Sequence, residues 1–211
     1  MKRSLALAVC GFSLVLALVG GWLADRQFTA ALDTLRTAFG GKTVLVLAPG
    51  ASLAEETGRN AVAAAKADCI VSANFCPEFC QPDYAFFTNS KRFEKLDLAA
   101  LPCPVVLTSN LRPLPQGALA VNYDRLAAPD VQNASLGSNS VLMLLRLLRL
   151  CGAKAVLLAG ADGYKPGTPA YADSLLHAHT GRGAAFNTAM AGAIKACGLD
   201  VTFITPSEYA K

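Results

Sequence analysis

The stretch Thr43-Val-Leu-Val-Leu-Ala-Pro-Gly-Ala-Ser-Leu-Ala-Glu-Glu56 decides the fold. Residues 44–48 form a continuous apolar run that breaks on Pro49-Gly50. A second run, Ala155-Val-Leu-Leu-Ala-Gly-Ala-Asp-Gly-Tyr164, also ends on glycine and polar residues. Such runs are typical of strands buried on both faces, as in the parallel sheets of α/β proteins. Ligands of those proteins bind outside the carboxyl ends of the strands, so the sequence predicts a site near Ser52 and Asp162.

Composition limits the class of protein. The chain has 211 residues, 53% of them hydrophobic, and a formal net charge of +4. This length holds one domain of ordinary size, expected over residues 27–211, after a separate N-terminal segment. The hydrophobic content supports a large core and argues against disorder. No Lys/Arg cluster follows one face of a predicted element, so a nucleic-acid partner is not expected.

Predicted strands and helices alternate along the chain. The expected strands are 43–48, 68–74, 84–88, 105–108, 155–159 and 199–204. The expected helices are 27–39, 52–66, 141–150 and 183–197. Ser52 and Glu55 have the spacing of a capping box at the start of the second helix. Residues 112–132 are Pro-rich and irregular, with a short apolar piece at 118–121. The alternation predicts a three-layer α/β sandwich with a mainly parallel, Rossmann-like sheet, preceded by an N-terminal hydrophobic helix.

Residues 1–26 form the separate segment. Lys2 and Arg3 precede an apolar, charge-free run over residues 4–23, which is long enough to cross a bilayer as a helix. The alternative is a cleavable signal peptide, because Val19-Gly20-Gly21 offers small residues near the end of the run. The run is long for a signal peptide, so we expect a membrane-associated protein with a single N-terminal anchor.

The side of the membrane is left open by two opposing patterns. The positive residues before the apolar run place the globular part across the membrane, by the positive-inside rule. Six of the seven cysteines lie after residue 26, and Cys69, Cys151 and Cys197 sit in or beside apolar runs. Free buried cysteines of this kind suit a reducing compartment better than an oxidising one.

Small polar residues follow the predicted strands. They are Ser52 after Gly50, then Asn74, Asn89, Ser109 or Asn110, and Asp162. Parallel strands end along one edge of the sheet, so these side chains are expected to converge on one ligand. Asn and Ser offer neutral donors and acceptors for ribose and base edges, and Asp accepts from hydroxyls. Taken singly, each is also an ordinary turn residue; five at successive strand ends favour a shared site.

Ser138-Asn139-Ser140 opens the Leu-rich helix. Free backbone N–H groups at a helix start bind anions, so the segment predicts a phosphate site. The alternative is simple N-capping by Ser138 or Asn139. The chain contains neither GxGxxG nor GxxxxGK[ST], which argues against a standard dinucleotide or P-loop site, and it lacks the GxSxG of hydrolases.

The predicted loop 160–180 contains both histidines of the chain, His177 and His179, together with Tyr164 and Tyr171. Histidine acts as a general base near neutral pH. The alternatives are a metal site, for which only Asp173 accompanies the pair, and exposed loop histidines without a role. We therefore expect no metal and no cofactor, and a loop of this composition suits a lid over the crevice.

The order of these motifs resembles the bacterial sialyltransferases of glycosyltransferase family 42. The matching positions are Gly50, Ser52, Asn74, Asn89, Ser138 to Ser140, Asp162, Tyr164, Tyr171 and His177 or His179. The resemblance implies that this set holds a CMP-sugar, with a histidine as base toward the acceptor and the tyrosines near the phosphate. The turn after the first strand lacks the Asn typical of that family.

A closer resemblance, over residues 27–211, is to the C-terminal domain of aldolase-like proteins of the HMG-CoA-lyase type in surface-polysaccharide loci. The shared motifs include Leu-Ala-Pro-Gly-x-Ser (47–52), Phe-Phe-x-Asn-x-Lys-Arg (86–92), Leu-Ala-Gly-x-Asp-Gly-Tyr (158–164) and Phe-Ile-Thr-Pro-Ser-x-Tyr (203–209). The chain has no aldolase barrel of its own. This resemblance implies the fold and an aldolase-type partner protein.

Two functions follow from the sequence. The first is a membrane-associated glycosyltransferase that uses a nucleotide-activated sugar, with a CMP-sugar favoured. The absence of an Asp-x-Asp motif favours metal-independent binding. The second is a non-catalytic nucleotide or sugar-phosphate binding module that serves an aldolase-type enzyme in polysaccharide synthesis.

Overall fold

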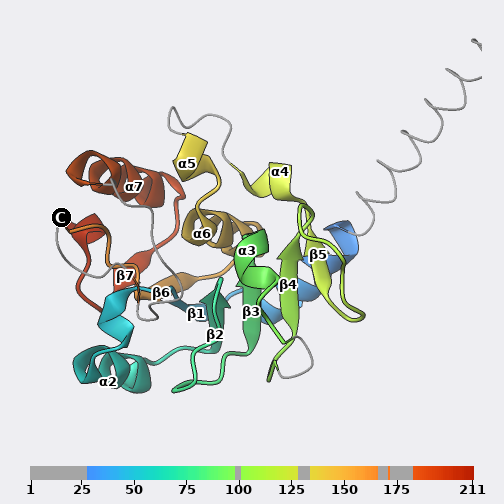
Figure 1. Ribbon diagram of the computed structural model, residues 1–211, viewed down its shortest axis with the longest axis horizontal. Helices are drawn as coiled ribbons and strands as arrows, with labels where there is room; N and C mark the ends of the chain where they lie inside the picture. The colour runs from blue at the N-terminus through green and yellow to red at the C-terminus, as the bar shows by residue number, and fades with distance from the viewer. Residues whose placement is uncertain (1–27, 98–100, 128–133, 166–170, 172–182) are drawn as a thin grey trace, which may run out of the picture.

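The computed structural model describes residues 28–97, 101–127, 134–165, 171 and 183–211 (Figure 1). The expected anchor and the two histidines lie outside these residues. Within the described part of the chain, no helix has both the length and the apolar character needed to span a bilayer.

A single sheet of seven strands organises the described residues. Its strands are β1 (Thr43–Leu47), β2 (Cys69–Ala73), β3 (Tyr84–Phe87), β4 (Val105–Thr108), β5 (Leu119–Val121), β6 (Ala155–Ala159) and β7 (Val201–Phe203). Their order across the sheet is β5-β4-β3-β2-β1-β6-β7, and every neighbouring pair is parallel. This confirms the predicted α/β class with a Rossmann-like parallel sheet.

Helices connect most of the strands, although β2 and β3, and β4 and β5, follow one another without a helix between them. The helices are a helix over residues 28–39, then α2 (Glu56–Ala64), α3 (Ser90–Phe93), α4 (Tyr123–Leu126), α5 (Ala134–Gly137), α6 (Ser140–Leu150) and α7 (Ala184–Ala196), with 3-10 turns η1 (Ala51–Leu53) and η3 (Glu208–Ala210). The predicted capping box is wrong. Glu55 is the N-cap of α2, and Ser52 lies one turn earlier in η1.

Helices cover both faces of the sheet because alternate side chains of each strand point to opposite sides. In β1, Val44 and Val46 pack into the core cluster that contains α6, α7 and the helix over 28–39. Leu45 and Leu47 pack on the other face, against Val62 of α2. Figure 1 shows α6 and α7 on one side of the sheet and α2 on the other. Three layers result.

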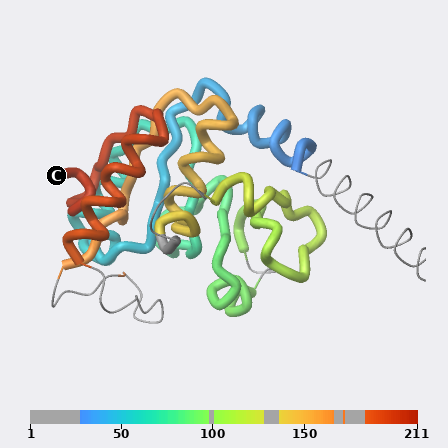
Figure 2. The backbone as a smooth tube through the Cα atoms, turned by 90° about the horizontal axis from the view of Figure 1, so that it is seen from above, coloured from blue at the N-terminus to red at the C-terminus, as the bar shows by residue number. Residues whose placement is uncertain are grey.

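Packing also explains where the cysteines lie. Cys69, Cys151 and Cys197 are buried in the same large core cluster as α6 and α7. Their position beside apolar runs predicted this burial, and small sulfur side chains fill such sites well. The helix over 28–39 packs into that cluster too, at the end of the molecule opposite to α7 (Figure 2).

The helical connections that follow β1 and β6 lie on opposite faces of the sheet. The chain runs from β1 through α2 to β2, and from β6 through α7 to β7, and these two helices pack on different sides of the sheet. β1 lies between β2 and β6. The strand order therefore reverses here, and in open α/β sheets such a switch point is where the ligand crevice forms.

Candidate functional site

A crevice of about 1470 Å³ lies at the carboxyl edge of the sheet. It brings together residues that are far apart in the sequence, from the ends of four strands, the start of α6 and the loop after β6. Nine of the twelve predicted site residues line it: Gly50, Asn74, Asn89, Ser138, Asn139, Ser140, Asp162, Tyr164 and Tyr171. Ser52 is buried and does not line the crevice, with 7% of its surface exposed. His177 and His179 lie outside the described residues.

The loops after β1 and β6 are joined through a carboxylate. The backbone N–H of Ser52 donates to Asp162 Oδ2 at 2.7 Å, and Ser52 Oγ donates to Asp162 Oδ1 at 2.6 Å. Gly50 N donates to Gly160 O at 2.7 Å. A Cβ at Gly50 would lie 2.1 Å from Gly160 O and 2.6 Å from Asp162 Cγ, so only glycine allows this close approach.

Part of the hydrogen-bond acceptor capacity of the Asp162 carboxylate is therefore used by Ser52. Burial raises the pKa of this carboxyl group, and the two hydrogen bonds from Ser52 counteract part of that rise. Both oxygens have a protein donor, but a carboxylate offers about four acceptor positions. Asp162 thus fixes the loop after β1 and retains acceptor capacity toward the crevice.

The C-terminal segment supports the loop that carries Asp162. Thr205 Oγ1 accepts from Gly160 N at 2.9 Å, and Ser207 Oγ donates to Ala161 O at 2.5 Å. Glu208 N donates to Asp162 O at 2.8 Å. Thr205 and Ser207 were not among the predicted site residues. The Thr-Pro-Ser motif was the available signal, and its contacts show that it positions the site.

Asn74 joins the ends of β2 and β3. It has a left-handed backbone, with φ of 59°, and only 5% of its surface is exposed. Asn74 Oδ1 accepts from Thr88 N at 2.9 Å and from Asn89 N at 3.4 Å. Asn110 continues this network, because its Nδ2 donates to Thr88 O at 3.1 Å. These amides form a polar floor whose members hold one another in place.

Two predicted asparagines cap helices. Asn89 Oδ1 accepts from Arg92 N at 3.2 Å at the start of α3. Asn139 Oδ1 accepts from Val141 N at 2.9 Å and Leu142 N at 3.2 Å at the start of α6. Asn139 is therefore the N-cap of α6, as the N-capping alternative for residues 138–140 predicted. Ser140 still lines the crevice.

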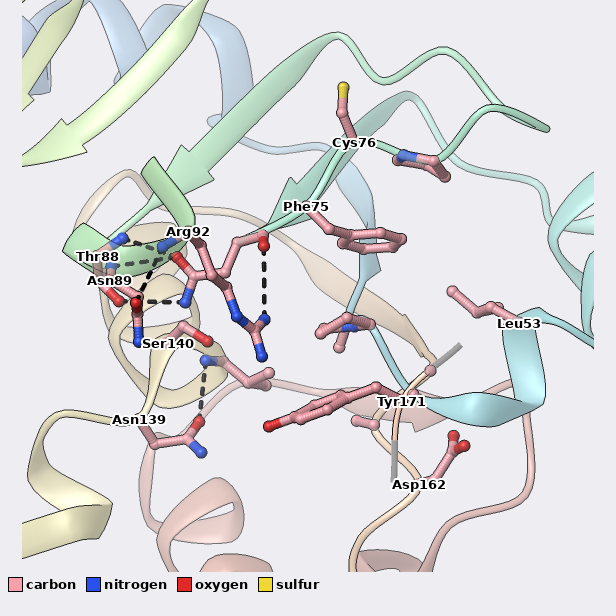
Figure 3. A pocket seen from close by; sticks show the side chains of 18 of the residues that line it. Leu53, Phe75, Cys76, Thr88, Asn89, Arg92, Asn139, Ser140, Asp162 and Tyr171 are labelled. Atoms are coloured by element: carbon pink, nitrogen blue, oxygen red, sulfur yellow. Dashed lines mark hydrogen bonds between the residues drawn. The ribbon is translucent and has the colours of Figure 1, made fainter. Parts of the chain in front are cut away.

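The two tyrosines differ in their surroundings. Tyr164 is held by Asn187, whose Oδ1 accepts from Tyr164 N at 3.0 Å and whose Nδ2 donates to Tyr164 O at 2.9 Å. Its ring packs edge-on against Phe186, with centroids 5.4 Å apart. Tyr171 forms an antiparallel bridge with Gly50, and its ring lies 4.8 Å from the guanidinium carbon of Arg92. Tyr171 therefore lies across the crevice (Figure 3).

Basic side chains also line the crevice, and none of them was among the predicted site residues. Four of them line the crevice, namely Arg59, Lys91, Arg92 and Lys95, against two acidic ones, Glu78 and Asp162. The available signal was the Lys-Arg pair that follows the predicted cap at Asn89. An excess of positive charge in a cleft raises the local concentration of anions. Phe75 and Leu53 add apolar surface, so the crevice offers polar, charged and apolar contacts (Figure 3).

Within the described residues, no group of three or more His, Cys, Asp or Glu side chains could hold a metal ion. The fold and crevice define an α/β protein with a Rossmann-like parallel sheet and a polar, basic cleft at its switch point. Neither a protein-family model nor a curated protein matches the chain.

Proposed function

We propose that this protein binds a nucleotide-activated sugar, with a CMP-sugar favoured, and transfers the sugar without a metal ion. The observation that supports the proposal is the crevice at the switch point. It combines neutral amide and hydroxyl side chains with an excess of basic ones. Neutral groups suit base and ribose edges, and the basic groups suit phosphate.

The size of the crevice agrees with such a ligand. Its volume of about 1470 Å³ exceeds the roughly 300–1,000 Å³ of common small-molecule pockets. A crevice of this size is large enough for a nucleotide with an attached sugar. The polar floor around Asn74 and Asn110 is rigid because its amides bond to neighbouring backbone, which lowers the entropic cost of ordering it on binding.

The chemical step is assigned by resemblance to family 42 sialyltransferases. His177 or His179 would deprotonate the acceptor hydroxyl, and Tyr164 and Tyr171 would lie near the phosphate. Tyr171 suits this role because it contacts both Gly50 and Arg92 at the crevice. A positioned general base contributes about 10²–10⁴-fold to the rate.

The second candidate is a non-catalytic nucleotide or sugar-phosphate binding module that partners an aldolase-type enzyme. One observation favours it. The polar groups at the strand ends are engaged with one another, as in the Ser52–Asp162 and Asn74–Thr88 bonds. Groups that are hydrogen-bonded to one another in this way are less available for proton transfer, which favours a binding role for them over a catalytic one.

A thermal-shift screen with CMP, UMP, AMP and GMP tests the binding that both candidates share. A ligand at 100 times its Kd adds about 2.7 kcal/mol to the free energy of unfolding. We expect the largest rise in Tm with CMP. Hydrolysis of a CMP-sugar by the wild type then supports the transferase, and binding without turnover supports the module. If none of the four nucleotides raises the Tm, the transferase and the nucleotide-binding module both fail, and only a module that binds a sugar phosphate remains.

We also propose that residues 4–23 anchor the protein to a membrane. The test is fractionation of the full-length chain beside a chain that starts at residue 27. The full-length chain should sediment with membranes and the shorter one should remain folded and soluble, since the first strand begins at Thr43. Uncleaved full-length chain in a detergent-free soluble fraction would exclude the anchor.

A further inference from the structure

Arg92 is held in one orientation inside the crevice. Its backbone is fixed by the Asn89 cap, and its guanidinium donates to the backbone oxygen of Asn74 at 3.5 Å. The guanidinium carbon lies 4.8 Å from the centroid of the Tyr171 ring. Figure 3 shows the side chain extending from α3 into the crevice, above Tyr171 and opposite Ser140.

The charge of Arg92 has no carboxylate partner among the described residues. The ion pairs there join Asp33 to Arg36, and Glu208 to Lys165 and Lys211. A guanidinium presents five N–H donors in a planar fork, and within the described part of the chain one long hydrogen bond uses them. The ring of Tyr171 covers one face of the guanidinium, and the side chain of Arg92 is half-buried and lines the crevice.

The other basic side chains of the crevice are less suited to a specific contact. Lys91, Lys95 and Arg59 are exposed, whereas Arg92 is half-buried. Arg59 also donates to Ala54 O at 3.1 Å, at the solvent-exposed end of its helix. Water and salt screen exposed charges, while a half-buried charge keeps more of its interaction with a ligand. Arg92 is therefore the basic group best placed to select an anion.

We propose that Arg92 binds a phosphate group of the ligand. This proposal rests on the proposed nucleotide-binding function. The phosphate would lie at the β2–β3 side of the crevice, beside the guanidinium N–H groups and not on the face that Tyr171 covers. Asp162 lies on the far side of β2 and β1, at the end of β6, where its carboxylate would repel a phosphate. The uncharged parts of the ligand then extend toward Asp162, whose remaining acceptor positions suit hydroxyls. The ligand thus has one orientation in the crevice.

The test is a calorimetric titration of the full-length chain in detergent, with CMP, cytidine and inorganic pyrophosphate as probes. Arg92→Gln removes the charge at nearly constant size, and Arg92→Lys keeps the charge without the fork. Lys91→Gln is the matched control, because it removes the same charge from the neighbouring exposed position. The Tm of each variant shows that it is folded.

We expect Arg92→Gln to weaken CMP binding by about 10- to 100-fold, because charge-assisted bonds to phosphate are lost. Arg92→Lys should lie in between. Lys91→Gln should lose less than about threefold, as exposed charges do. Cytidine, which has no phosphate, should bind wild type and Arg92→Gln equally.

Three outcomes would overturn the assignment of Arg92. One is CMP binding by Arg92→Gln at wild-type affinity, which leaves the proposed function intact. Another is an equal loss in Lys91→Gln, which indicates a diffuse field rather than a contact. The third is an equal loss for cytidine, which indicates a distorted crevice. If the wild type binds pyrophosphate through Arg92 but no nucleotide, the anion site stands and the proposed function fails. If it binds none of the probes, both fail.

Discussion

Ser52 and Asp162 are 110 positions apart in the chain, and two hydrogen bonds of 2.6 and 2.7 Å join them. The pair connects the loop after β1 to the loop after β6, at the point where the strand order reverses. It therefore fixes the two walls of the crevice relative to each other. A site built on loops needs such ties, because binding geometry depends on rigid support.

The first prediction concerns this pair. Ser52→Ala removes one hydrogen bond to a partly buried carboxylate, so the free energy of unfolding should fall by about 1.5–3 kcal/mol. Asp162→Ala should cost more, because Ser52 N and Oγ both lose their acceptor. It should also weaken CMP binding by about 1–3 kcal/mol if ligand hydroxyls use the remaining acceptor positions. Urea denaturation and calorimetry measure the two effects.

The control for that comparison is Asp33→Ala, which removes an exposed carboxylate paired with Arg36. Exposed pairs contribute at most about 1 kcal/mol. A loss in Ser52→Ala no larger than the loss in Asp33→Ala would show that the Ser52–Asp162 tie is weak.

The second prediction is a pH dependence. Burial raises the pKa of Asp162 above its ordinary value of about 4, so at a pH between the unfolded and the folded pKa the native state keeps a proton that the unfolded chain has released. The stabilising contribution of this proton is fully present below about pH 4, where the unfolded chain also holds it, and is lost as the pH rises through the folded pKa. Denaturation of wild type and Asp162→Asn between pH 4 and 8 isolates it. The stability of wild type relative to the variant should increase as the pH falls; a constant or opposite difference would contradict the shift.

The third prediction uses two glycines. A Cβ at Gly50 would meet Gly160 O at 2.1 Å, so Gly50→Ala should destabilise the fold by about 1–3 kcal/mol and abolish ligand binding. Gly192 lies inside α7, where a Cβ would meet nothing within 4 Å. Gly192→Ala should therefore stabilise the protein by about 0.5–1 kcal/mol, from helix propensity alone. Thermal unfolding of both variants checks the contrast, and equal effects would refute the close approach at Gly50.

Local patterns were enough to predict most of the fold. Continuous apolar runs located six of the seven strands. Parallel strands are buried on both faces, so their sequences are apolar throughout and do not alternate between apolar and polar residues. β5 was missed as a strand, since its three residues, Leu119–Val121, lie in a Pro-rich region and gain their strand character from pairing with β4. The strand order depends on contacts across the whole chain, and no short window of sequence contains it.

The candidate site was predictable as a location but not as a set of contacts. Strand-end residues converge on one crevice because parallel strands end together. Their partners were not visible, and the Ser52–Glu55 spacing suggested a cap when the partner of Ser52 is Asp162, 110 positions away. Arg92 was missed for the same reason. Its orientation depends on Asn74 and Tyr171, which lie in other segments of the chain.

The fourth prediction concerns the histidines and separates the enzyme from the binding module. Replacing both His177 and His179 by alanine should leave CMP affinity nearly unchanged, since their proposed role is proton transfer. Hydrolysis of the CMP-sugar should fall by about 10²–10⁴-fold. Single variants identify which histidine acts. If the double variant hydrolyses donor as fast as the wild type, the base assignment is wrong and the module is favoured.

All of these proposals require a nucleotide to occupy the crevice at the switch point between β1 and β6. A crystal structure of the chain that starts at residue 27, grown with CMP, tests this requirement most directly. We expect the phosphate within hydrogen-bond distance of Arg92 and the ribose hydroxyls toward Asp162, between the ends of β3 and β6. A nucleotide bound elsewhere on the molecule, or an empty crevice at millimolar CMP, would contradict this expectation.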